Sequence, residues 1–427
     1  MTETQILFDL LEKGVSPAHA VSACEERLVE AGFEKLDYGT AWKLEMGSKY
    51  YVNHYDTTLF AFTLPTNWGK AEPAVRIAAA HTDFPCLRIK PACDMKNNGY
   101  AQLNIEVYGG AILNTWLDRP LGIAGRVALR SEDVFHPDVR KFISKKNITI
   151  PNLAIHMNRE VNKGVELNKQ TELLPITGLL EGEETGAYFM DFMAAELKVA
   201  KEDILDYELT VFCDEKPQFV GLQDELISAP RLDNLNSCAA LVSAIINSER
   251  TDGLNMIALF DHEEIGSGTK QGAASIMLHD MVRRILDNLG ANLEEIERTI
   301  YGAMLLSVDV AHALHPNKAG KMDITNKPVL GKGLCIKQAA SQSYATDAEA
   351  SAIFCQICDS KEIPYQRFMN RSDAVGGGTL GNLAAKNFPV KTMDIGVPML
   401  AMHSARELMG TKDIDSLKDA VTAFFAL

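Results

Sequence analysis

The spacing of apolar residues predicts one early helix and then strands. From Pro17 to about residue 31, apolar positions recur at helical spacing, and Ser16 and Pro17 are residue types that favour a helix start. Residues 49–64 and 74–85 are instead rich in β-branched and aromatic residues, which is typical of strands. We therefore expect a helix that packs beside a sheet.

The pattern then changes twice along the chain. Between about 92 and 220, short alternating segments such as "AQLNIEVYGG" (101–110) are separated by Gly, Asn and Pro, which predicts a mostly β region. After residue 230, apolar runs typical of strands alternate with longer runs at helical spacing. This alternation predicts an α/β fold with a largely parallel sheet, built from residues 1–91 and 221–427 and interrupted by residues 92–220.

Composition excludes several classes of function. The 427 residues are 46% hydrophobic, enough for a large core, and the formal net charge of −15 argues against a nucleic-acid partner. No stretch approaches the roughly 18 to 20 apolar residues of a membrane span, and the first residues lack the basic segment of a signal peptide. We expect a cytoplasmic protein without a membrane partner.

The cysteines do not indicate a disulfide framework. Eight are present, and only "CQIC" (355–358) pairs two of them closely. Because no second CxxC exists and the run has helical spacing, we interpret Cys355 and Cys358 as buried thiols on one apolar face.

Titratable side chains gather where the predicted strands end. In an open α/β sheet, ligands bind at the carboxyl ends of the strands, so these side chains are expected to converge. The group comprises His81, Asp83, Asp233, Asp261, His262, Glu263, Glu264, Asp309 and His403.

Such a cluster favours a metal site. Several carboxylates and imidazoles buried together would be costly without a cation, and nitrogen plus oxygen ligands suit zinc, manganese or cobalt. One acid beyond the metal shell can act as a general base. Because neighbours on an extended chain point opposite ways, Glu263 and Glu264 are expected to supply one ligand and one base.

Some of these residues have simpler interpretations. Asp261 and His262 could cap a following helix, and His315 is better explained as a loop histidine. "HEEIG" (262–266) lacks the second histidine of the helical zinc motif, and "GGGTLG" (376–381) does not follow a buried strand as a dinucleotide motif would.

Seven motifs together resemble the M18 aminopeptidases, the aspartyl aminopeptidase family. The resemblance covers essentially the whole chain, in the family's order. The motifs are "AAHTDFPCLRIKP" (79–91), "RLDNLNSC" (231–238), "DHEEIGSGT" (261–269), "SVDVAHALHPN" (307–317), "YATDAEA" (344–350), "NRSDAVGGGTLG" (370–381) and "DIGVPMLAMHSARE" (394–407).

The resemblance implies a site with two divalent ions, zinc first, with manganese or cobalt as alternatives. Asp233 would bridge the ions, His81 and Asp309 would complete the first, and Glu264 and His403 the second. Glu263 matches the general base, and Asp83 would orient His81. The family's fold implies an α/β catalytic domain (1–91 and 221–427), a dimerisation domain (92–220) and a tetrahedral homododecamer of dimers.

The family's activity implies release of N-terminal residues from peptides. Lys337 matches a position associated with acidic N-terminal residues, although "IKQAASQS" (336–343) departs from the form expected for aspartyl specificity, and other members resemble leucine-preferring enzymes. His156 matches a histidine that reaches a neighbouring subunit's site, with Asn152 where relatives can have a second histidine. His312 is assigned to substrate binding.

Two other classes of function stay open. The metal chemistry alone would suit another dinuclear hydrolase, such as a carboxypeptidase or deacylase. A non-catalytic assembly or cargo protein is the second, although a structural metal site would have no use for the additional acid Glu263.

Overall fold

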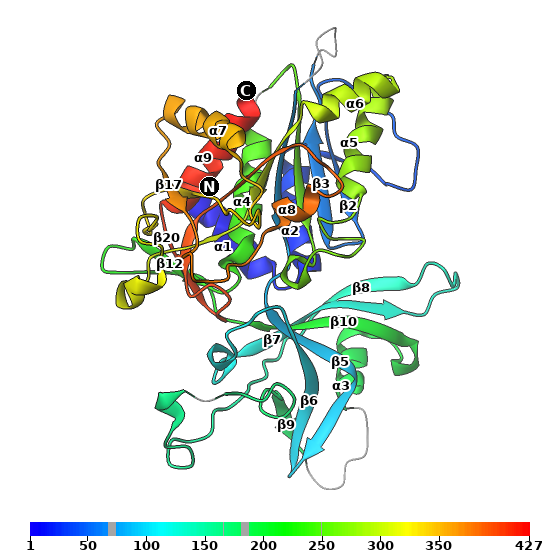
Figure 1. The fold of residues 1–427 in the computed structure, drawn as a ribbon. Helices are drawn as coiled ribbons and strands as arrows, with labels where there is room; N and C mark the ends of the chain where they lie inside the picture. Colours follow the sequence, from blue (N-terminus) through cyan, green and yellow to red (C-terminus); the bar gives the residue numbers. More distant parts are fainter. Residues whose placement is uncertain (67–73, 165, 181–187, 249) are drawn as a thin grey trace. The chain divides into compact units, whose positions relative to one another are not determined.

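A computed structural model describes the chain except for residues 67–73, 165, 181–187 and 249 (Figure 1). The described residues pack into two compact units. Unit 1 comprises Met1–Phe84, Pro217–Met402 and Glu407–Leu427, and unit 2 comprises Pro85–Lys216 with the short segment His403–Arg406.

Unit 1 is built on a nine-stranded sheet. Its central strands β13, β4, β14 and β18 run parallel, whereas β3 and β16 beside them are antiparallel to their inner neighbours. This arrangement confirms the expected α/β fold. In order across the sheet, the strands are β1 (Glu34–Lys35), β2 (Lys49–His54), β3 (Thr58–Thr63), β13 (Leu254–Phe260), β4 (Val75–His81), β14 (Met304–Val308), β18 (Lys391–Gly396), β16 (Leu334–Lys337) and β17 (Tyr365–Phe368).

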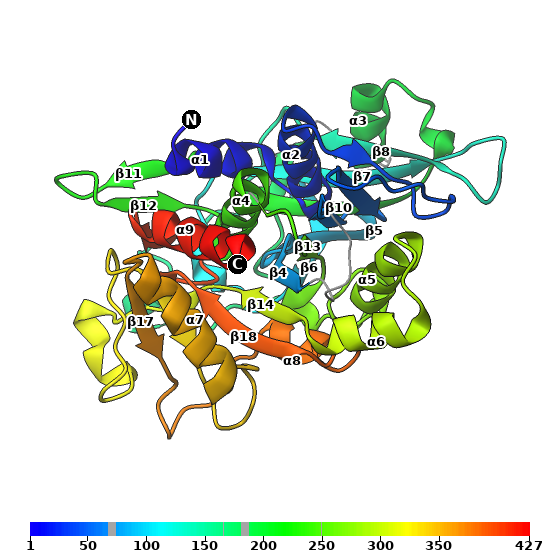
Figure 2. The same cartoon turned by 90° about the horizontal axis from the view of Figure 1, so that it is seen from above.

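Helices cover both faces of this sheet, which is why the central strands are apolar almost throughout (Figures 1 and 2). Ile77 and Ala79 of β4 share one core cluster with Met281 and Ile285 of α5, while α4 packs on the other face. The helices of unit 1 are α1 (Glu3–Lys13), α2 (Pro17–Glu30), α4 (Leu232–Asn247), α5 (Met277–Asn288), α6 (Leu293–Tyr301), α7 (Ala348–Ser360), α8 (Leu380–Ala384) and α9 (Asp413–Ala426).

The helix expected at Pro17 is confirmed as α2, with Ser16 at its N-cap. The Ser16 hydroxyl, however, lies 2.8 Å from Nδ1 of His19 and makes no capping bond to the helix backbone. The sequence interpretation did not identify α1, whose capping box joins Thr2 and Gln5. None of the described helices is long and apolar enough to cross a membrane.

A second sheet of unit 1 positions the chain around residue 400. Its outer strand β15 pairs in parallel with β19, and β19 pairs antiparallel with β20. The strands, in order, are β11 (Gln218–Val220), β12 (Leu226–Ala229), β20 (Glu407–Gly410), β19 (Pro398–Leu400) and β15 (Ala311–His312).

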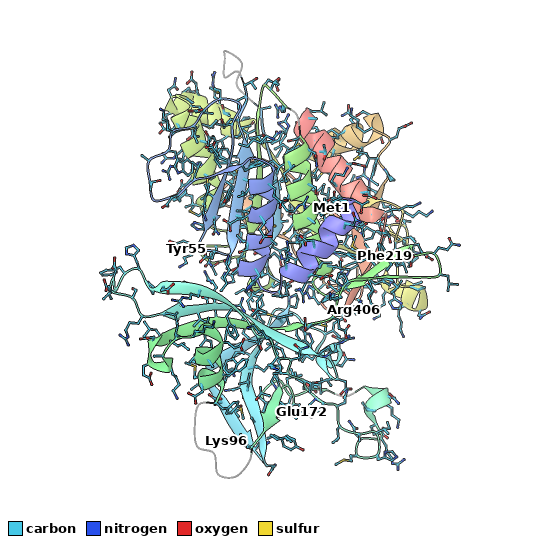
Figure 3. The ribbon with its side chains drawn as sticks, turned by 180° about the vertical axis from the view of Figure 1, so that it is seen from behind. Met1, Tyr55, Lys96, Glu172, Phe219 and Arg406 are labelled. Atoms are coloured by element: carbon cyan, nitrogen blue, oxygen red, sulfur yellow. The ribbon has the colours of Figure 1, made fainter. Side chains whose placement is uncertain are left out.

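Unit 2 is a six-stranded antiparallel sheet with α3 (Tyr188–Leu197) packed against β5. The expectation of a mostly β region is therefore confirmed. Lys96, near the end of β5, is labelled in Figure 3. The strands, in order, are β8 (Asp138–Ile143), β7 (Leu121–Leu129), β10 (Ile204–Cys213), β5 (Cys86–Asn97), β6 (Tyr100–Tyr108) and β9 (Ile176–Leu179).

The cysteine interpretation is only partly confirmed. All eight thiols are free, and Cys358 is buried. Cys355 is half-exposed, and its Sγ accepts a hydrogen bond from Nη2 of Arg367 at 3.3 Å. The expectation that both thiols of the motif are buried is wrong for Cys355, because that side of α7 faces the polar edge strand β17.

Candidate metal and active site

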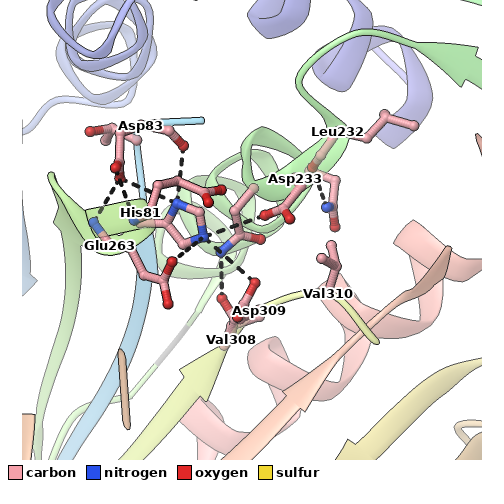
Figure 4. Close-up of polar contacts among 12 residues, drawn as sticks. His81, Asp83, Leu232, Asp233, Glu263, Val308, Asp309 and Val310 are labelled. Atoms are coloured by element: carbon pink, nitrogen blue, oxygen red, sulfur yellow. Dashed lines mark hydrogen bonds and ion pairs between the residues drawn. The ribbon is translucent and has the colours of Figure 1, made fainter. Parts of the chain in front are cut away.

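Three parallel strands deliver acidic and imidazole side chains to one edge of the sheet (Figure 4). His81 is the last residue of β4, and its register partner on β13 is Phe260, which directly precedes Asp261. On the other side of β4, strand β14 ends at Val308, immediately before Asp309. The parallel order therefore brings the ends of β13 and β14 to either side of His81.

The buried His81 ring lies at the centre of the cluster. Its Nε2 is 3.4 Å from Oδ1 of Asp233, 3.6 Å from Oδ1 of Asp309 and 4.0 Å from Oε2 of Glu263. Its Nδ1 lies 3.0 Å from the backbone oxygen of Asp83, to which an Nδ1–H would donate. That hydrogen bond leaves the Nε2 lone pair directed at the carboxylates, as in a metal-binding histidine.

The pKa values of His81 and Glu263 are shifted because several carboxylates gather in a buried site. Burial alone would lower the pKa of His81, but the carboxylates of Asp233, Asp309 and Asp83 raise it well above its usual range. Burial, with Asp309 and Asp83, raises the pKa of Glu263 from 4.5 to about 8, although His81 opposes the rise. Both shifts show that the site favours positive charge beside its carboxylates, which a bound divalent ion would supply.

Asp83 fixes the turn that carries the two glutamates. Its Oδ1 accepts the backbone N–H of Glu263 at 3.1 Å, and its Oδ2 accepts that of Glu264 at 3.2 Å. Oδ1 also lies 3.4 Å from Nδ1 of His81. Asp83 is fully buried, so these contacts are shielded from water.

The expectation that Glu263 and Glu264 extend in opposite directions is wrong. His262 adopts a left-handed conformation with φ of 64°, and Glu263–Ile265 form a 3-10 turn, η4. A 3-10 turn rotates successive side chains by a third of a turn and not by a half, so both carboxylates face His81.

Asp233 stands at the irregular start of α4. Arg231 is left-handed with φ of 62°, and Asp233 itself departs from helical dihedral angles. The Asp233 N–H donates to Oε2 of Glu407 at 2.9 Å, and Nδ2 of Asn234 donates to the carbonyl of Val308 at 2.8 Å. Glu407 was missed by the sequence interpretation, although it ends the motif "DIGVPMLAMHSARE".

The donor set suits a divalent metal. His81, Asp233 and Asp309 each offer one ligand atom, and these atoms lie within 4.8 Å of one another. His81, Glu263 and Glu264 form a second group by the same measure. One imidazole nitrogen and several carboxylate oxygens are ligands that zinc accepts.

Lys337, at the end of β16, contacts Asp309. Its Nζ donates to the carbonyls of Val310 at 2.7 Å and Asp309 at 3.3 Å, and it is 3.6 Å from Oδ2 of Asp309. Burial alone would lower the Lys337 pKa, but Asp309, followed by Tyr344 and Asp394, raises it above its usual value. The lysine is thus a buried cation that already contacts a predicted metal ligand.

The remaining predicted residues have less central places. His312 ends β15, is exposed, and packs its ring against Phe368 with centroids 6.0 Å apart. His315 accepts from the N–H of Asn317, which agrees with a loop histidine. The N–H of His262 donates to Asp261, and its Nδ1 lies 2.9 Å from Oγ1 of Thr269, so these contacts support the turn before η4.

Two predicted residues belong to unit 2. His403 directly follows Met402 of unit 1, and its Nδ1 is 3.2 Å from the carbonyl of Gly110. His156 is exposed in a loop. Near the start of this loop, Asn152 donates hydrogen bonds from its N–H and its Nδ2 to the Asp118 carboxylate, each at 2.8 Å.

Comparison with known proteins gives the same family across the whole chain. Residues 10–425 match the family model described as aminopeptidase I zinc metalloprotease (M18). A Clostridium novyi protein described as probable M18 family aminopeptidase 2 is 42% identical over 95% of this chain and 94% of its own length.

Two solved structures have the same fold. The chain in the Ape4 and Nbr1 complex is 32% identical with a TM-score of 0.94, covering 99% of this chain and 85% of that one. The S. cerevisiae mApe1 dodecamer is 25% identical with a TM-score of 0.84, covering 99% of this chain and 95% of that one.

Proposed function

The chain belongs to the M18 family of zinc aminopeptidases, and from that premise we propose that it releases single N-terminal residues, preferentially Asp or Glu, from peptides at a site with two divalent ions. The observation that carries this proposal is the buried His81 ring among three carboxylates at the carboxyl edge of parallel strands. The carboxypeptidase, deacylase and non-catalytic alternatives find no support in the family match.

The proposed ligands follow the strand ends. His81 and Asp309 would hold one ion and Glu264 and His403 the other, with Asp233 shared between them. The contacts of Asp233 with Glu407 and of Asp83 with the η4 turn support this assignment, because second-shell hydrogen bonds orient metal ligands. Zinc is the expected metal, with manganese or cobalt as substitutes.

Bound divalent ions would polarise the scissile carbonyl and lower the pKa of a water molecule toward neutrality. The Glu263 carboxylate then accepts a proton from the attacking water and returns it to the leaving amine. Its position on η4, tied to Asp83, keeps it beside His81 and Asp233. Asp83 acts as the positioning residue for both His81 and Glu263.

The preference for acidic N-terminal residues rests on Lys337. With the Asp309 carboxylate engaged by a metal ion, the buried ammonium beside it offers positive charge to a substrate carboxylate. His312, exposed at the end of β15 and packed on Phe368, is proposed as a further substrate contact.

Unit 2 is proposed as a dimerisation domain within a tetrahedral homododecamer in the cytoplasm. The description of a related structure as a dodecamer supports such an assembly. The His156 loop exposes Leu153 and Met157, at 53% and 74%, which is typical of a segment that packs against another chain. We propose that His156 reaches the active site of the neighbouring subunit.

The activity is tested with a peptide panel. Zinc-loaded protein should release the first residue from peptides that begin with Asp, Glu, Leu or Ala, fastest for Asp and Glu, and should not act on the same peptides with acetylated N-termini. Chelator-treated protein and Glu263→Gln are the controls. Release of the C-terminal residue, or equal cleavage of blocked peptides, would refute the aminopeptidase assignment.

The shared site is tested by complementation. His156→Ala should lower activity without changing metal content or oligomer mass. Mixed with Glu263→Gln after subunit exchange, it should regain activity, because a subunit with Glu263 can use the neighbour's His156. Activity equal to the sum of the separate variants, with exchange verified by mass, would rule out action in trans.

A further inference from the structure

The segment His403–Arg406 has a strained start. Ala401 has φ of 56° and His403 has φ of 67°, left-handed conformations that residues other than glycine rarely adopt. Such conformations persist where surrounding contacts hold them. The segment is joined at both ends to unit 1, through Met402 and Glu407, yet it packs with unit 2.

Backbone and ring contacts of unit 2 hold this segment. The carbonyl of His403 accepts from the N–H of Ile112 at 2.9 Å, and the N–H of Ala405 donates to Oγ1 of Thr115 at 2.8 Å. The ring Nδ1 of His403 lies 3.2 Å from the carbonyl of Gly110, so an Nδ1–H can donate to that carbonyl and Nε2 is the nitrogen proposed to bind the metal.

The Glu215 carboxylate connects Arg406, in the segment His403–Arg406, to Arg119, which bonds to the Thr115 backbone. Its Oε1 accepts from Nη1 of Arg119 at 2.7 Å, and its Oε2 accepts from Nη1 of Arg406 at 3.2 Å. Arg119 in turn donates from Nε to the carbonyl of Thr115 at 2.6 Å. Arg406, labelled in Figure 3, is the least exposed of the three charged side chains, at 14% against 27% for Arg119 and 28% for Glu215.

We propose that Glu215 is a positioning residue for His403. Without its carboxylate, two guanidinium groups near one another would lose the anion between them, and Arg406 would lose its charged partner while its bond to the Lys216 carbonyl at 3.0 Å remained. The strained backbone before it could then relax and turn the His403 ring away from its bound orientation. This inference rests on the proposed role of His403 as a ligand of the second metal ion.

The test measures zinc binding rather than turnover. Glu215→Gln keeps the side-chain length and removes the charge, and it should weaken the lower-affinity zinc site about 10- to 100-fold, the usual cost of losing a partner that orients a ligand. After gel filtration, zinc should fall from about two ions per subunit to about one. With cobalt in place of zinc, the visible absorption of the second site should change.

Glu208→Gln is the matched control. Glu208 also pairs with an arginine of unit 2, but that arginine is Arg126, so the pair joins β10 to β7 and not to the segment His403–Arg406. It should bind zinc like the wild-type protein. Arg406→Gln tests the same link from its other end, and the double variant should be no weaker than the worse single variant, since both remove one connection.

The variant His403→Ala distinguishes the proposed ligand role of His403 from the proposed positioning role of Glu215. If His403→Ala keeps both zinc ions, the proposed ligand assignment fails, whatever Glu215 does. If His403→Ala loses one ion while Glu215→Gln and Arg406→Gln both bind two with wild-type affinity, the positioning role of Glu215 is overturned. Thermal unfolding and oligomer mass identify any variant that fails to fold, and the remaining variant of the pair then decides.

Discussion

Replacing Asp83 by Asn should weaken metal binding and activity together. The Asp83 carboxylate accepts the N–H groups of Glu263 and Glu264 and lies 3.4 Å from the His81 ring. Asparagine has the same shape but a single acceptor oxygen. Its amide N–H₂ would face a backbone N–H, so one donor of the η4 turn would lose its acceptor in a buried site.

The structure sets the size of this effect. One charge-assisted hydrogen bond becomes a neutral one and the other is lost, and a hydrogen bond to a charged group contributes about 1.5 to 3 kcal/mol. At about 1.4 kcal/mol for each tenfold change, zinc affinity should fall by roughly 10- to 150-fold. Because η4 also carries Glu263, kcat should fall with it.

The measurement is a competition titration with a chromophoric zinc chelator, followed by kcat and KM at saturating zinc. Asp83→Ala, which removes both acceptors, should be worse than Asp83→Asn. The control is Asp133→Asn, because Asp133 makes similar bonds to a backbone N–H and a histidine in an exposed loop of unit 2. Unchanged zinc affinity and kcat in a folded Asp83→Asn protein would refute the positioning role.

Three other changes test the same site. Glu263→Gln should lower kcat about 10²- to 10⁴-fold with zinc retained, while Glu264→Gln should lose zinc first; exchanged phenotypes would reverse their roles. Lys337→Leu should reduce turnover of Asp and Glu substrates more than that of Leu substrates, by a difference in activation free energy of about 1.5 to 3 kcal/mol. An equal fall for both classes would mean that Lys337 acts only through its contact with Asp309. In metal-free protein, Glu263 keeps its proton up to about pH 8 when folded but releases it near 4.5 when unfolded, so stability should decrease as pH rises between these values. Denaturant titrations should show a flatter pH dependence for Glu263→Gln, and an unchanged slope would contradict the raised pKa.

The fold could be predicted because its signals are local. Buried parallel strands such as β4 and β13 are apolar runs, and helices such as α2 begin with Ser and Pro, which favour a helix start, and carry periodic apolar faces. The convergence of His81, the "DHEE" run and Asp309 follows from the same signals, because parallel strands end at one edge.

The remaining features depend on contacts between distant residues. The bond from the Asp233 N–H to Glu407 spans 174 positions, and no local pattern identifies it. Likewise, Lys337 is an ordinary strand residue in the sequence, and only the tertiary structure shows its ammonium against the Asp309 and Val310 carbonyls. The geometry of Glu263 and Glu264 was misjudged because it depends on the left-handed His262, a conformation that the residue type does not encode.

The formal charge of the groups around His81 agrees with the proposal of two divalent ions. The buried ammonium of Lys337 lies 3.6 Å from Oδ2 of Asp309 and offsets part of the negative charge of the carboxylates. Counting six carboxylates and this ammonium alone, the net charge is five negative, so a single divalent ion would leave three negative charges and two ions would leave one. Uncompensated buried charge is costly, which agrees with the rise in the pKa of Glu263 that burial and the nearby Asp309 cause. The carboxylates counted are those of Asp83, Asp233, Glu263, Glu264, Asp309 and Glu407.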